Sequence, residues 1–63
     1  MKLKKFRETE VFKIANIVVY YDRDGNEIEP TTEVQRRKMF NMEVNGHETL
    51  NKNELVVLEI FLK

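Results

Sequence analysis

The sequence predicts an all-β domain, a small antiparallel meander of about five strands that forms a barrel or a curled sheet. Three observations support this prediction. Residues 14–21 are dense in β-branched and aromatic side chains, residues 40–45 place an apolar side chain at every second position, and residues 55–62 are almost entirely apolar. The alternative is an α+β fold in which a C-terminal helix, at about 51–62, packs on the sheet.

The N-terminal segment 3–11 is the first candidate strand. Lys4, Phe6 and Glu8 alternate on one side of it. A short helix is the alternative for this segment, although its apolar residues follow no clear helical period.

Residues 14–21 and 27–29 are expected to form a β-hairpin. The run 22–26 between them contains Asp, Asn and Gly, the residues that tolerate the left-handed backbone of tight turns. Both faces of 14–21 are apolar, which is typical of a central strand. The turn superficially resembles an EF-hand loop, but Glu27 stands where that loop requires Gly, so we expect no calcium site.

The alternating segment 40–45 predicts a half-buried strand. The pair Asn45–Gly46 favours a two-residue hairpin turn, after which residues 47–50 would pair back. A helix over 32–44 is the alternative, because Thr32 followed by Gln35 matches a capping box. We prefer the strand because the apolar residues of 32–44 do not repeat every 3.6 positions.

The C-terminal segment 55–62 predicts a strand whose even-numbered residues face the core. We place it at an edge of the sheet, where its second apolar face is free to pair with another chain. The competing helix would begin near Asn51, with Glu54 completing a capping box.

The composition argues against an enzyme. The 63 residues include no Cys, Ser or Trp and a single His, so the usual nucleophiles are missing apart from Thr and Lys, and a metal site built on Cys and His lacks its ligands. We expect one domain over 1–63, without cofactor, metal or small-molecule substrate. No apolar run approaches the ~20 residues of a membrane helix, and the lack of Cys fits a reducing compartment. These features predict a soluble, cytoplasmic protein with no membrane association.

The function that the sequence favours is a non-enzymatic protein-binding module: a small inhibitor, adaptor or assembly protein. Small proteins of phages and mobile elements often have such a composition, and the chain resembles them in this respect. Because so small a core cannot cover both faces of the C-terminal segment, we expect a homodimer that also binds an unidentified protein. The predicted protein-binding residues are aromatic or apolar: Tyr20, Tyr21, Leu55, Val57 and Phe61.

The alternative function is nucleic-acid binding by a small β-barrel, through the basic blocks 2–7 and 36–38. The block residues proposed to contact phosphates are Lys4, Lys5, Arg7, Arg36, Arg37 and Lys38. Eleven acidic residues balance eleven basic ones, which is unusual for a dedicated nucleic-acid binder. The deciding feature is whether the two blocks meet on one face.

Overall fold

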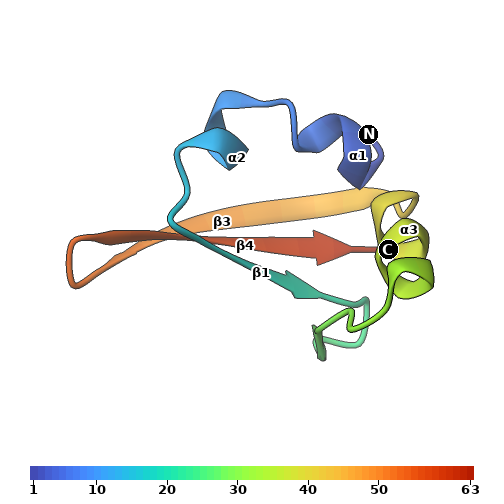
Figure 1. The fold of residues 1–63 in the computed structure, drawn as a ribbon. Helices are drawn as coiled ribbons and strands as arrows, with labels where there is room; N and C mark the ends of the chain where they lie inside the picture. The colour runs from blue at the N-terminus through green and yellow to red at the C-terminus, as the bar shows by residue number, and fades with distance from the viewer.

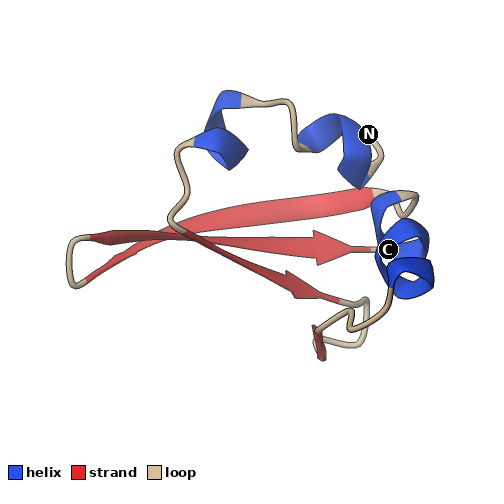
Figure 2. Ribbon diagram, viewed as in Figure 1, coloured by secondary structure: helices blue, strands red, loops and turns tan.

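The computed structural model describes residues 1–63 and combines a four-stranded sheet with three short helices (Figures 1 and 2). In chain order the elements are α1 (Leu3–Phe6), α2 (Glu10–Lys13), β1 (Ile17–Tyr21), β2 (Glu27–Ile28), α3 (Glu33–Phe40), β3 (Val44–Lys52) and β4 (Leu55–Leu62). The fold is therefore α+β, and the predicted all-β meander of five strands is wrong. The alternative class fits, although its C-terminal helix does not form.

The sheet is mixed, with the strand order β2-β1-β4-β3. β4 lies between β1, to which it is parallel, and β3, to which it is antiparallel. The prediction of a strand at 55–62 is confirmed, but its predicted position at a sheet edge is wrong. With apolar residues on both faces, β4 occupies the sheet interior, where both of its backbone edges are hydrogen-bonded.

The core lies between this sheet and the helices. Both α1 and α2 lie on the same side of the sheet (Figure 1). The six buried residues of the core come from α1, α3 and β4: Leu3, Phe6, Met39, Leu58, Ile60 and Leu62. The even-numbered residues of β4 face this core, as the alternation predicts. Burial of these side chains is the main source of stabilisation available to so small a chain.

The predicted N-terminal strand at 3–11 is wrong, because this segment forms α1 and α2. Leu3 and Phe6 are spaced three residues apart, so one helical turn directs both into the core. Two apolar residues are too few to reveal a helical period in the sequence, yet they suffice to dock a single turn.

The predicted strand at 40–45 is wrong over most of its length, because only its last two residues belong to β3, and α3 occupies most of the competing helical segment. Thr32 caps α3, because its hydroxyl oxygen accepts a hydrogen bond from the Gln35 N–H at 3.1 Å. The Gln35 side chain in turn accepts a hydrogen bond from the Thr31 N–H at 2.8 Å. These reciprocal bonds satisfy backbone donors at the helix start and favour the helix over an extended chain.

Two turns connect the antiparallel strand pairs. The predicted hairpin is confirmed, although β1 begins at Ile17 and not at residue 14. In its turn, Oδ1 of Asp22 accepts hydrogen bonds from the N–H groups of Asp24 and Asn26, both at 2.9 Å. The predicted turn at Asn45–Gly46 is wrong, since this pair lies at a bulge inside β3. The chain instead reverses at Asn53–Glu54, where both residues have positive φ, 49° and 67°.

Candidate protein-binding face

One face of the sheet is not covered by any helix. α1 and α2 pack on the opposite face and α3 lies beside one end (Figure 1). The strand register defines which residues point to this uncovered side, because directly paired residues share a face. We call it the open face, and its apolar members are Ile17, Val19, Tyr21, Leu50, Leu55, Val57 and Phe61.

These apolar side chains remain accessible to solvent. Ile17 and Leu55 are 43% and 42% exposed, and the other members are partly buried by their neighbours in the sheet. Ile17, Val57 and Leu50 form a continuous row across three strands, because Val57 pairs with both of the others. A contiguous apolar surface on a protein of this size is typical of an interaction site.

Aromatic side chains form the other end of the open face. The rings of Tyr21 and Phe61 are stacked, with centroids 5.5 Å apart and planes 20° from parallel. The Tyr21 hydroxyl donates a hydrogen bond to Oε2 of Glu59 at 3.0 Å. This bond raises the pKa of the Tyr21 phenol above its usual value, and desolvation and the negative charges of Glu59 and Glu27 act in the same direction.

The middle of the open face is acidic. Glu48 and Glu59 are paired across β3 and β4, and Glu27 is paired with Tyr21 across β2 and β1. No cation forms an ion pair with any of these carboxylates. Lys52 is on the same face but lies at its far end, paired with Leu55. The open face thus combines apolar side chains with uncompensated negative charge.

Four of the five predicted protein-binding residues, Tyr21, Leu55, Val57 and Phe61, come together on the open face. Tyr20 does not, since it pairs with Ile60 and packs against the core on the opposite side. Partial burial raises the pKa of Tyr20, against the opposing positive charge of Arg7. Sequence reasoning missed Ile17, Val19 and Leu50 as binding residues, although the alternation along β1 already places the first two on the face of Tyr21.

The two basic blocks lie on helices that contact each other, since Lys4 and Lys5 belong to α1 and residues 36–38 to α3. Several of their cations already contact acidic or aromatic side chains within the chain. Lys5 contacts Glu8 at 3.6 Å, and the guanidinium of Arg7 lies over the ring of Phe40, 4.4 Å from its centroid.

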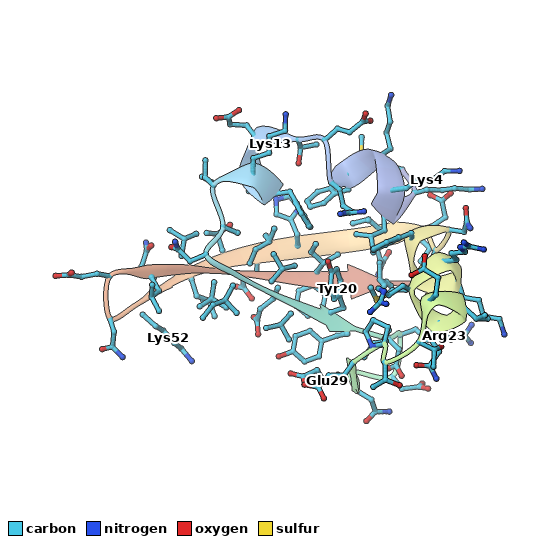
Figure 3. All side chains as sticks on the ribbon, in the orientation of Figure 1. Lys4, Lys13, Tyr20, Arg23, Glu29 and Lys52 are labelled. Atoms are coloured by element: carbon cyan, nitrogen blue, oxygen red, sulfur yellow. The ribbon has the colours of Figure 1, made fainter.

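Acidic neighbours also offset the charge of α3. Glu33 contacts Arg36 at 3.4 Å and Arg37 at 3.5 Å. Lys4 lies on the helical side of the sheet, whereas Lys52 lies on the other side (Figure 3). The basic blocks are thus brought to one end of the molecule, away from the open face.

Other chemistry is sparse. No group of three or more His, Cys, Asp or Glu side chains is arranged to hold a metal ion. The single histidine, His47, packs its ring against Phe6, with centroids 5.1 Å apart. None of the helices has the length and apolar character needed to cross a membrane.

Comparison with protein-family models, with curated proteins and with solved structures finds no match to this chain. The functional argument therefore depends on the geometry and chemistry of the open face.

Proposed function

We propose that the chain is a non-enzymatic protein-binding module, of the inhibitor, adaptor or assembly type, and that its open face is the docking surface. The observation that carries this proposal is the apolar row Ile17, Val57 and Leu50, which no element of the chain covers. Covering this row with a partner would remove apolar surface from water, which favours association. We also place this function in the cytoplasm, a location that the cysteine-free composition supports.

The charge of the face specifies the chemistry of the partner. Glu48 and Glu59 lie side by side between the apolar row and the Tyr21–Phe61 stack. A partner that covers them without a matching cation would bury unpaired carboxylates, at a cost of several kcal/mol. The best occupant is a segment that presents apolar side chains together with Lys or Arg.

Selection from a library of displayed random peptides against the immobilised chain tests this proposal. We expect enrichment of peptides that combine apolar residues with Lys or Arg, and binding to Val57→Asp at least about tenfold weaker than to the unmodified chain. Glu59→Gln keeps an acceptor for Tyr21 but removes the charge, so it should weaken the basic peptides selectively. Glu10→Gln, at an exposed position of α2, is the matched control.

Two results would contradict the proposal. One is a selection without enrichment, and the other is a set of enriched peptides that bind Val57→Asp and the unmodified chain equally well. Circular dichroism of each variant establishes that the sheet persists, so that a loss of binding is not a loss of folding.

Binding of nucleic acid is the second candidate function, and the contact between α1 and α3 favours it because this contact brings the two basic blocks together. Fluorescence anisotropy with labelled single- and double-stranded oligonucleotides tests it. Binding should fall steeply with salt and weaken in Arg36→Gln combined with Lys38→Gln. Absence of binding at low salt would remove this candidate, since screening is weakest there.

A further inference from the structure

The outer edge of β3 is the long unpaired strand edge of this molecule. β3 and β2 are the two edge strands, and β2 has only two residues. The N-terminal segment covers the beginning of the β3 edge, because the Val44 N–H donates to the Met1 carbonyl at 2.8 Å and the Leu3 N–H donates to the Met42 carbonyl at 2.9 Å. Residues 46–52 are left without a neighbouring strand on that side.

The pairing of β4 shows which backbone groups of β3 point outward. The Val56 carbonyl accepts a hydrogen bond from the Asn16 N–H at 2.9 Å, and the Val56 N–H donates to Oδ1 of Asn16 at 2.8 Å. Val56 therefore directs its backbone N–H and carbonyl toward β1. Its β3 partner Asn51 consequently forms no backbone hydrogen bond with Val56, and the pair is a non-hydrogen-bonded one. Because antiparallel pairs alternate, the groups of His47, Thr49 and Asn51 point away from the sheet.

We propose that a second copy of this chain adds to this edge, with β3 antiparallel to its twin and Leu50 opposite Leu50 of the second copy. In this register Thr49 lies opposite Asn51 of the second copy. Both residues direct their backbone groups outward, so each such pair exchanges two hydrogen bonds. The result is one continuous eight-stranded sheet with a two-fold axis at Leu50.

Side chains on the open face are complementary in this register. Leu50 contacts its own copy, and Glu48 lies opposite Lys52 of the second copy on both sides of the two-fold axis. These residues occupy the non-hydrogen-bonded positions, where facing side chains approach most closely. Glu48 and Lys52 are too far apart along one strand to pair within a chain, so the dimer supplies each with a partner of opposite charge.

Neighbouring registers are less favourable. Centring the pair on Glu48 places two carboxylates opposite each other. Centring it on Thr49 brings the turn Asn53–Glu54 of the second copy opposite Val44, where Met1 already occupies the edge. Centring it on Asn51 shortens the pairing and places Glu48 opposite Glu54 of the second copy. Only the register centred on Leu50 matches charge and leaves the N-terminal segment in place.

The assembly extends the open face across both copies. The row Ile17, Val57 and Leu50 continues through Leu50 of the second copy into the same residues in reverse order. This inference rests on the proposed protein-binding function, and it identifies one partner as a second copy of the chain. It also leaves the open face free to bind a further protein.

Sedimentation equilibrium over a wide range of protein concentration tests the assembly. We expect a monomer–dimer equilibrium, in which Glu48→Lys and Lys52→Glu each raise the dissociation constant about tenfold, because each creates two like-charge pairs. The double variant Glu48→Lys with Lys52→Glu should restore dimerisation, since it exchanges the charges. Glu10→Lys and Lys13→Glu, both on α2, are the matched controls and should leave the equilibrium unchanged.

Thr49→Pro provides a second test that does not depend on charge. Its missing N–H points outward, so the β3–β4 ladder keeps its bonds while the dimer loses two. We expect this variant to be monomeric. A chain that is monomeric at every concentration, or a dimer that these variants do not weaken, would overturn the inference.

The outcomes separate the assembly from the proposed function. If the chain stays monomeric but still selects peptides on its open face, only the assembly fails. If it dimerises with the expected mutational pattern but selects no peptide, the wider binding function fails and the assembly stands.

Discussion

The hydroxyl of Tyr21 in β1 donates a hydrogen bond to Oε2 of Glu59 in β4 at 3.0 Å, across the parallel strand pair. The bond joins the aromatic end of the open face to its acidic middle. The ring of Tyr21 also stacks on Phe61, so one hydrogen bond and one aromatic contact together orient it on the open face.

This bond predicts a pH dependence of stability. The folded-state pKa of Tyr21 is raised, so the contribution to stability is fully present below the unfolded pKa of ~10 and is lost as pH rises through the higher folded value. In a Tyr20→Phe background, absorbance titration should show Tyr21 ionising at lower pH after Glu59→Gln. An unchanged titration curve would mean that the carboxylate does not set this pKa.

The turn between β3 and β4 predicts a stabilising substitution. Glu54 has a φ of 67°, a left-handed conformation that costs a residue with a Cβ about 1 kcal/mol, and the preceding residue is Asn53. Glu54→Gly creates the Asn-Gly sequence that this turn type prefers. We expect the free energy of unfolding to rise by about 0.5–1 kcal/mol in urea denaturation.

Gly25→Ala is the converse substitution. Gly25 has a φ of 85° in the β1–β2 turn, and open space surrounds the position of an added Cβ. Backbone strain alone should therefore destabilise the variant, by about 1 kcal/mol. If Glu54→Gly lowered stability while Gly25→Ala raised it, the assigned turn conformations would be wrong.

Local signals in the sequence predicted local structure well. The β1–β2 turn was identifiable because Asp22 and Gly25 supply its side-chain bonds and its positive φ within five residues. The alternation in 55–62 likewise predicted which side chains of β4 face the core. The turn and the alternation both depend only on residues that are close together in the sequence.

Competing local signals caused the errors in the middle of the chain. Phe40, Met42 and Val44 alternate in the sequence, and all three pack against the same core. They do not belong to one strand, however, because Phe40 is the last residue of α3, Met42 lies in the connection, and Val44 is the first residue of β3. The Asn45–Gly46 pair falls at a bulge opposite Phe61 and not at a turn. The cap at Thr32 was the more reliable signal, because it satisfies otherwise unpaired backbone groups.

The apolar row of the open face could not be predicted, because it depends on pairing between strands that are far apart in the sequence. Val57 was selected from the pattern of its own strand. Ile17 lies beside Val57 because β1 pairs with β4, and Leu50 lies beside it because β3 pairs with β4. Ile17 and Val57 are forty residues apart in the sequence. No local pattern encodes that pairing, so the row across three strands emerged only in the folded chain.

The cap of α3 predicts a specific loss of stability. Thr32→Ala removes the acceptor of the Gln35 N–H and should lower the free energy of unfolding by about 1 kcal/mol. Thr32→Ser keeps the hydroxyl and should remain close to the unmodified chain. Urea denaturation of both variants compares them, and equal losses would show that the Thr32 methyl group, and not the hydroxyl, matters.

The N-terminal amine and Glu43 predict an acid-sensitive contact. Oε2 of Glu43 accepts a hydrogen bond from the Met1 amine at 2.9 Å, and this bond together with the positive charge of the amine lowers the pKa of the Glu43 carboxyl. Its contribution to stability is present above the unfolded pKa of ~4.3 and is lost as pH falls through the lower folded value. Acetylation of the amine should raise the Glu43 pKa in an NMR titration. An unaltered pKa would exclude the amine as its cause.

The two faces of the sheet should respond very differently to substitution. Leu58 is fully buried, so Leu58→Ala should lower the free energy of unfolding by about 2–5 kcal/mol and leave so small a domain marginal. Ile17→Thr and Leu55→Thr, on the open face, should cost less than about 1 kcal/mol, because these side chains are about as exposed as surface residues.

Thermal and urea denaturation of these three variants make that comparison. If the open-face variants keep their stability but lose selected peptides, their apolar side chains serve binding and not folding. Large losses of stability at Ile17 or Leu55 in dilute solution would instead mean that the open face is covered in the free protein. The proposed β3–β3 dimer covers neither Ile17 nor Leu55. Such losses would therefore mean that another segment of the same chain packs on the open face, in a fold that differs from this structure.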